Sequence, residues 1–160
     1  MHPRYGWARR GHRSISHAPG SRGENISVVS AMCSDGILAW HAWKGAMDSE
    51  LFLDFIERKV APKIRPGMVV VLDNSSIHKR DFIVPVVERR GGAVVFLPPY
   101  HPEFNAIEEV FSVVKTRLRQ RRERNIPDLI RALDEEFAKI HPKMACAFIR
   151  HALSHAAQAL

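Results

Sequence analysis

Two acidic residues, Asp73 and Glu108, are the side chains whose setting in the sequence best suits chemistry. Asp73 directly follows residues 69–72, a short valine-rich run between turn-forming residues that predicts a buried parallel strand. Glu108 follows a second apolar run, residues 93–97, and stands in the first turn of an expected helix. Because sites in open α/β sheets form beyond the carboxyl ends of the strands, we expect both acids at one edge of a sheet.

Paired carboxylates suit a hard cation such as Mg²⁺, which binds one or two protein carboxylates together with substrate phosphates. Such sites carry out phosphoryl transfer, in which two metal ions hold the attacking and leaving oxygens. Each acid alone has a simpler explanation, because Asp73 could be a turn residue and Glu108 a partner of the helix dipole. The occurrence of both acids in matched settings favours the metal site.

The segments around these two acids resemble catalytic blocks of mariner-like DDE transposases from bacterial insertion sequences. The first segment is Val-Leu-Asp-Asn-Ser-Ser-Ile-His-Lys, residues 71–79, and the second is Phe-Leu-Pro-Pro-Tyr-His-Pro-Glu-Phe-Asn-Ala-Ile-Glu-Glu, residues 96–109. Thirty-four residues (108 − 73 − 1) lie between the two acids, which matches the spacing of that family. Ala106 stands where the family usually has proline, a departure that removes only a helix-start signal.

The resemblance implies an RNase H-like fold and a DDE endonuclease that cleaves and joins transposon DNA with bound Mg²⁺ or Mn²⁺. It makes Asp73 and Glu108 the catalytic residues and metal ligands. Neighbouring helical residues differ in direction by about 100°, so only one of Glu108 and Glu109 can point toward Asp73 and act as a metal ligand. The resemblance selects Glu108. The implied partners are the transposon ends and target DNA, with a homodimer as a further expectation.

The family uses three carboxylates, and the first of them precedes a Tyr-Gly-Trp-Ala-Arg-Arg-Gly segment, which is residues 5–11 here. Met1 stands where that block should already be complete, and neither Asp35 nor Asp48 is a credible replacement. We therefore expect the first, central strand and its acid to be missing, and the activity to be impaired. The alternatives are a non-catalytic basic remnant that binds DNA or oligomerises, and another RNase H-like nuclease.

Eight further residues are candidates for contact with DNA: Trp7, Arg9, Arg10, Asn74, His78, Lys79, Lys115 and Arg119. The first three lie in a basic stretch with interleaved aromatic residues, typical of segments that touch phosphates or bases, although hairpin packing explains it equally well. Asn74 and His78 follow the strand-end acid, where capping of the loop is the simpler explanation. Lys115 and Arg119 lie on the helix that carries Glu108, where solvated basic residues are the alternative.

Composition supports this interpretation without deciding it. The 160 residues suffice for one domain with a real core, and 24 Lys and Arg against 17 Asp and Glu give a net charge of +7, which favours a polyanionic partner. Cys33 and Cys146 lie in separate apolar contexts and predict buried free thiols. Without a signal-peptide pattern or a run of about 18 apolar residues, we expect a cytoplasmic bacterial protein that meets the nucleoid when bound to DNA, and no membrane.

These side chains must be positioned by an α/β domain. We expect an RNase H-like mixed sheet flanked by helices, whose first two remaining strands form an antiparallel hairpin around Ser34-Asp35-Gly36 and whose last two are parallel. Residues 1–125 form the catalytic core of this domain, and residues 126–160 form a helical extension of it.

Helices are expected over residues 48–60, 79–90, 105–124, 127–140 and 142–157. Pro85 conflicts with the second of these helices and predicts a late start or a kink. Asn105 is the expected N-cap of the third, whose apolar residues recur at helical spacing from Ile107 to Leu118. A basic strip from Arg117 to Arg124 continues the same helix.

Overall fold

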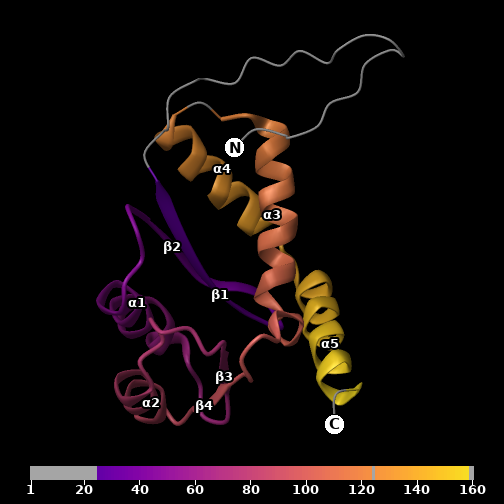
Figure 1. Cartoon of the computed structure of the whole chain (residues 1–160). Coiled ribbons are helices and arrows are strands. Elements are labelled where there is room, and N and C mark those ends of the chain that lie inside the picture. Colours follow the sequence, from indigo (N-terminus) through magenta and orange to yellow (C-terminus); the bar gives the residue numbers. More distant parts are fainter. Residues whose placement is uncertain (1–24, 124, 159–160) are drawn as a thin grey trace.

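A β-hairpin begins the part of the chain that this computed structural model describes, residues 25–123 and 125–158 (Figure 1). Strand β1 (Ile26–Cys33) pairs antiparallel with β2 (Gly36–Lys44), as predicted. Gly36 adopts a positive φ of 122°, and a Cβ atom at this position would lie 2.5 Å from the carbonyl oxygen of Ile140. The hairpin turn therefore requires glycine twice, for its backbone conformation and for its packing.

Strands β3 (Val69–Leu72) and β4 (Ala93–Phe96) form a parallel pair, as predicted. The expected burial of β3 was wrong, because only Leu72 of its four residues is buried. The amide of Leu97 donates to the carbonyl of Leu72, so the pairing extends to the carboxyl ends of both strands. The two strand pairs do not join into the single mixed sheet that we expected, but form separate two-stranded sheets. Within residues 25–123 and 125–158, no strand bridges the two pairs, so both outer edges of each pair are unpaired.

Helix α1 (Ser49–Phe55) begins at Asp48, whose side chain accepts a hydrogen bond from the amide of Leu51. It continues into a π-helical turn, η1 (Ile56–Val60), and a 3₁₀ turn, η2 (Ala61–Lys63). The predicted helix over residues 48–60 is thus confirmed, with an irregular second half that precedes Pro66.

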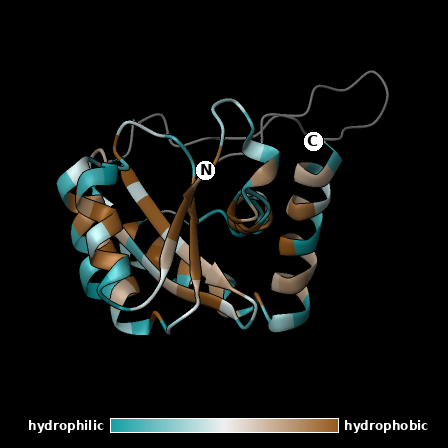
Figure 2. Ribbon diagram, turned by 90° about the horizontal axis from the view of Figure 1, so that it is seen from below, coloured by the Kyte–Doolittle hydropathy of each residue, from teal (hydrophilic) through white to brown (hydrophobic). Residues whose placement is uncertain are grey.

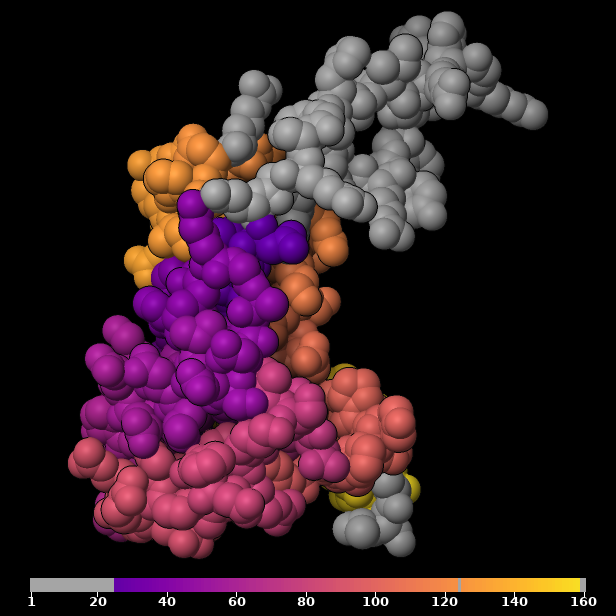
Figure 3. Space-filling view, turned by 60° about the vertical axis from the view of Figure 1, so that its left-hand side comes forward, coloured from indigo at the N-terminus to yellow at the C-terminus, as the bar shows by residue number. Residues whose placement is uncertain are grey.

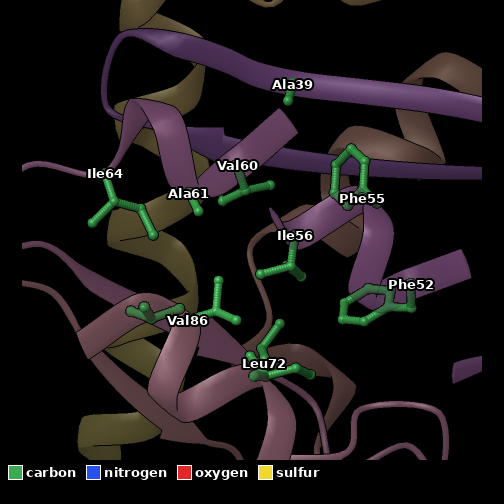
Figure 4. Close-up of a cluster of buried hydrophobic side chains, with 11 residues drawn as sticks. Ala39, Phe52, Phe55, Ile56, Val60, Ala61, Ile64, Leu72 and Val86 are labelled. Carbon is green, nitrogen blue, oxygen red and sulfur yellow. The ribbon is translucent and has the colours of Figure 1, made fainter. Parts of the chain in front are cut away.

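Helix α2 (Arg80–Glu88) connects the two parallel strands. It begins within one residue of the predicted position and includes Pro85, so the proline does not shorten the helix at its start. Its buried side chains Ile83, Val86 and Val87 pack against residues of α1 and η1 in one hydrophobic core (Figure 4). In the space-filling view, the segment of α1 to η2 lies directly against the segment that follows β3 (Figure 3).

A short turn, η3 (Pro102–Phe104), leads into the long helix α3 (Ile107–Arg121), and the chain ends with α4 (Ile126–Ala138) and α5 (Pro142–Gln158). All three helices were predicted, but the N-cap of α3 was not Asn105. Ala106 occupies that position without a side-chain cap, and Asn105 contributes only its carbonyl oxygen, which accepts from the amide of Glu108. The turn η3 ends at Asn105 and fixes its backbone, so its side chain makes no capping bond.

The hairpin separates two hydrophobic cores by the alternation of its side chains. One face contacts the core formed with α1, η1 and α2, and includes Val29 and Ala39. The opposite face includes Val28 and Trp40 and contacts a core formed by α3, α4 and the start of α5. Helices therefore lie on both sides of the strands, as Figure 2 shows.

The face of β3 and β4 that points away from the first core is exposed. Val69, Val71 and Val95 are 55%, 46% and 49% accessible to solvent. Three exposed valines on neighbouring strands are unusual for a half-buried sheet, in which one face normally carries polar side chains. Among the described residues, no helix is both long enough and apolar enough to span a membrane.

Candidate functional site

Asp73 stands at the carboxyl end of β3, where the predicted strand was expected to deliver it. Its Oδ1 atom accepts a hydrogen bond of 3.0 Å from the amide of Ser75, which closes a tight turn after the strand. The ring nitrogen Nδ1 of His78 lies 2.8 Å from the same oxygen and 3.1 Å from the carbonyl oxygen of Asp73. Since both partners are acceptors, Nδ1 of His78 carries the proton and holds the carboxylate in place.

The His78 ring is itself fixed by the core. Its side chain is only 11% exposed, and its ring lies 4.1 Å from that of Phe52 on α1, centroid to centroid. His78 therefore lies between Asp73 and the core residue Phe52. The direct contact of His78 with DNA that the sequence suggested stays a prediction. Within the described residues, no hydrogen bond or ion pair involves the second carboxylate oxygen of Asp73, which remains available to a ligand.

The structure distinguishes the two adjacent acids at the start of α3. Glu109 Oε1 lies 2.7 Å from Nδ1 of His151 on α5, at hydrogen-bonding distance. Glu108 points elsewhere and is exposed, and it forms no side-chain hydrogen bond or ion pair in the part of the chain described. The choice of Glu108 as the catalytic acid rests on the resemblance and stays a prediction.

The loop between β4 and α3 carries features that the sequence analysis left unassigned. Tyr100 is 98% exposed and has a positive φ of 64°, a conformation that non-glycine residues rarely adopt. The neighbouring His101 ring stacks on Phe104 and lies 2.9 Å from Glu103. That hydrogen bond from His101 lowers the pKa of Glu103, as does its own backbone amide. The sequence indicated a turn at Pro-Pro-Tyr, but not the exposure or the strained backbone of Tyr100.

Asp73 and Glu108 fit a hard divalent cation by the chemistry of their donors, because both offer carboxylate oxygens that the protein leaves free. In residues 25–123 and 125–158, no group of three or more His, Cys, Asp or Glu side chains is arranged to hold a metal ion. Asp73 and Glu108 can therefore supply two ligands of a metal site, which needs additional ligands to be complete. The close approach of Asp73 to Glu108 stays a prediction.

The other DNA-contact candidates fall into three groups. Trp7, Arg9 and Arg10 lie outside the described residues. Asn74 and Lys79 are exposed after the β3 strand end, and Lys79 lines a shallow pocket with Phe82 and Leu53. Lys115 and Arg119 are exposed on α3, on the same side as Glu108.

Some arginines of the expected basic strip on α3 point toward α4. Arg121 forms ion pairs of 2.6 Å with Glu135 and 3.3 Å with Glu136 on α4, and Arg117 lies 3.6 Å from Glu136. These two arginines therefore contact α4, while DNA contact by the basic strip stays a prediction. Glu135 and Glu136 of α4, about 15 positions later in the sequence, thus occupy guanidinium groups that could otherwise contact DNA phosphates.

The two cysteines are free, as predicted, but both are only partly buried. The Cys146 thiol lies 3.5 Å from the carbonyl oxygen of Ser34, near the hairpin turn. The expectation of buried thiols was therefore wrong, since both cysteines have intermediate exposure.

Comparisons with known proteins give one family and one set of similar structures. The family model of the DDE superfamily endonucleases matches residues 1–130. No curated protein matches the chain in sequence.

Solved structures of the Mos1 transposase are among those similar to this chain. The Mos1 strand transfer complex has a TM-score of 0.75 at 16% identity over 94% of this chain and 47% of that one. The Mos1 mariner paired-end complex with Mn gives 0.70 at 15% identity, over 91% and 46% of the chains. The catalytic domain of the Mos1 mariner transposase gives 0.65 at 16% identity, over 77% and 66%.

The chain spans about half the length of the Mos1 chains in the complexes. At such low identity the likeness shows the fold, and it confirms the predicted RNase H-like architecture. The match of the family model covers most of the sequence, including both candidate acids. The chain therefore belongs to the DDE superfamily endonuclease family.

Proposed function

We propose that this chain is the catalytic part of an insertion-sequence transposase of mariner-like type, which cleaves and joins transposon DNA with a divalent metal ion. The observation that carries this proposal is Asp73, held at the carboxyl end of a parallel strand by His78, thirty-four residues (108 − 73 − 1) before the unpaired Glu108. Membership of the DDE family and similarity to Mos1 support transposition as the process.

In the proposed reaction, water and then a 3′-hydroxyl group attack phosphodiester bonds of DNA. Asp73 and Glu108 would hold Mg²⁺ or Mn²⁺, which would supply charge stabilisation of the phosphoryl group and activation of the nucleophile. His78 keeps the Asp73 carboxylate from rotating, and thereby presents its free oxygen in one direction. Lys115, two helical turns after Glu108, is placed to neutralise a phosphate near the same site.

We further propose transposon ends and target DNA as the partners, in the cytoplasm of a bacterium. The Mos1 structures are complexes of a strand transfer product and of paired transposon ends, which makes DNA the natural partner of the same fold. The net charge of +7 is compatible with this partner. A homodimer is part of the proposal, since joining two ends requires two active sites.

The second candidate function is DNA binding without turnover. The observation in its favour is that the described residues offer no group of three metal-binding side chains. A two-metal site that has only two protein carboxylates holds its ions less firmly, so we propose that the chain as printed is impaired or inactive.

A cleavage assay on a duplex carrying the terminal repeats of the element tests both candidates. The wild-type chain is compared with Asp73→Ala and Glu108→Ala in Mg²⁺ and in Mn²⁺, with Asp54→Ala as the matched control because Asp54 only pairs with Arg58 on the surface of α1. Activity that both site variants lose and the control keeps supports the transposase.

Salt-dependent DNA binding that all variants share, without cleavage in either metal, favours the binding function instead. Strong cleavage by both the Asp73→Ala and the Glu108→Ala variant would show that neither acid is required for catalysis. Cleavage of an RNA–DNA hybrid in place of the duplex would point to an RNase H-like nuclease of another kind.

A further inference from the structure

Two histidines on α5 bring their ring nitrogens together beside the first turn of α3. His151 and His155 are one helical turn apart, and their Nε2 atoms are separated by 3.1 Å. Their rings are 4.5 Å apart, centroid to centroid, and inclined by 68°. Both rings therefore present the same nitrogen toward one point in space.

Glu109 determines which nitrogen of His151 is free. Its Oε1 atom lies 2.7 Å from Nδ1 of His151, and an ionised carboxylate can only accept a hydrogen bond. The proton of the neutral His151 ring is therefore on Nδ1, and Nε2 carries a lone pair directed toward His155. A histidine that gives one N–H to a carboxylate and offers the other nitrogen is the usual arrangement of metal-binding histidines.

The surroundings of the pair favour a cation. Glu109 of α3 lies on one side, and Glu103 of η3 is near enough to His155 for their charges to interact. The side chain of His101, which lies beside Glu103, is directed to that carboxylate. The pair is also accessible, because His151 is exposed and His155 is only partly covered.

We propose that His151 and His155 bind one divalent transition-metal ion of the Ni²⁺ or Zn²⁺ class, with Glu109 as the residue that orients His151. Two nitrogens that are 3.1 Å apart and each about 2.1 Å from one ion subtend roughly 95° at that ion. This angle is near the right angle between neighbouring ligands of a six-coordinate ion, so water completes the shell.

This site is distinct from the carboxylate site of Asp73 and Glu108. Imidazole nitrogen selects late transition metals, whereas Mg²⁺ prefers oxygen ligands. Only two protein ligands contribute, which agrees with the lack of any three-residue metal cluster among the described residues and predicts a modest affinity. The site contacts the first turn of α3 only through Glu109, which adjoins Glu108 and lies 2.7 Å from Nδ1 of His151.

Titration of the full-length chain with Ni²⁺ in a non-coordinating buffer tests the proposal by calorimetry. We expect His151→Ala and His155→Ala each to weaken the strongest binding step by about tenfold or more, and Glu109→Gln by roughly tenfold. His41→Ala is the matched control, because His41 is an exposed histidine on β2 whose ring lies against Trp43. It should leave this step unchanged, and Mg²⁺ should not compete for it.

The chain contains 9 histidines, so the diagnostic result is the difference between wild type and variants rather than binding as such. A second measurement is the thermal unfolding midpoint, which Ni²⁺ should raise in the wild type but not in a His151→Ala/His155→Ala double variant. Equal Ni²⁺ affinity of the wild type and this double variant would overturn the proposal. The contact between the two rings would then be a hydrogen bond without a role in metal binding. An unchanged affinity in Glu109→Gln would overturn the role given to Glu109. Neither result depends on whether the chain cleaves DNA.

Discussion

His78 connects the apolar core to the acid at the end of β3. One side of its ring packs on Phe52, and its Nδ1 holds the Asp73 carboxylate. The sequence placed His78 near Asp73 but could not show its direction, because five residues of loop allow many paths. The partner Phe52 comes from α1 and is not suggested by any local pattern.

Replacement of His78 with alanine should lower the free energy of unfolding by about 2 kcal/mol, through lost ring packing and a lost hydrogen bond. It should also reduce any Asp73-dependent cleavage, since the carboxylate is then free to rotate. Urea denaturation measures the first effect, with His41→Ala as a control of similar size at an exposed position. Equal stability of both variants would show that the His78 ring contributes no more than a surface histidine.

Glu136 is the one buried charged residue of the part described, with a side chain only 3% exposed. Burial raises the pKa of Glu136, but hydrogen bonds from Lys139 and Arg121 and the positive charges of Lys139 and Arg117 outweigh this effect and lower the pKa below its ordinary value. A carboxylate whose pKa is lower in the folded state stabilises the fold above its unfolded pKa. This stabilisation is lost as the pH falls through the folded pKa.

We therefore expect Glu136→Gln to cost about 2 kcal/mol of stability at neutral pH, because the glutamine keeps the volume but loses the charge. Below pH 4.5, the ordinary value for this carboxyl, the stability of the wild type should decrease toward that of the variant. Urea denaturation at a series of pH values measures this convergence. Parallel stability curves would mean that Glu136 does not titrate differently in the folded state.

Two asparagines precede helices, and only one of them caps its helix with its side chain. Asn125 accepts a hydrogen bond of 2.8 Å from the amide of Asp128 at the start of α4. Asn105 precedes α3 but uses its backbone carbonyl alone. Asn125 directly precedes α4, whereas Ala106 separates Asn105 from the first residue of α3, so the predicted cap at Asn105 was placed one residue too early.

The pair gives a matched experiment on helix capping. Asn125→Ala should lower the free energy of unfolding by about 1 kcal/mol, since it removes a side-chain cap. Asn105→Ala should change stability much less, because the alanine retains the carbonyl that is used. Thermal or urea unfolding of both variants measures the contrast, and a larger loss at position 105 would contradict it.

Periodicity predicted the elements well, because each strand and helix depends on residues close in sequence. The valine run of β3 and the helical spacing of Val110, Val114 and Leu118 in α3 are examples of such local signals. The partners of Arg121 and Glu109 were not predictable, since Glu135 and His151 come from other helices and pair across the fold. The candidate catalytic acids Asp73 and Glu108 were identified by the resemblance of their motifs, and their catalytic role and close approach stay predictions.

At the scale of the whole molecule, the separation into two small sheets leaves apolar surface and strand edges uncovered. Val69, Val71 and Val95 form an exposed patch on β3 and β4, next to the unpaired edge of β3. An uncovered edge beside such a patch is a site for pairing with another chain. The sequence suggested one mixed sheet, because strand patterns do not reveal which strands are neighbours.

We expect the chain to self-associate as its concentration rises, and a Val71→Thr/Val95→Thr variant to do so less. Threonine keeps the shape and strand propensity of valine but makes the patch polar. Light scattering over a concentration series measures the association, with Leu153→Gln on α5 as the control at another exposed apolar position. Identical association of all three proteins would place the contact elsewhere.

The close contact at Gly36 ties the beginning of the described chain to its end. A methyl group there would collide with the backbone of Ile140, at the junction of α4 and α5. The last two helices are thus fitted to the hairpin through backbone atoms, which no change of rotamer can relieve. A position that tolerates only hydrogen makes the carboxy-terminal helices inseparable from the strands, so evolution or engineering could exchange that tail only together with the turn it rests on.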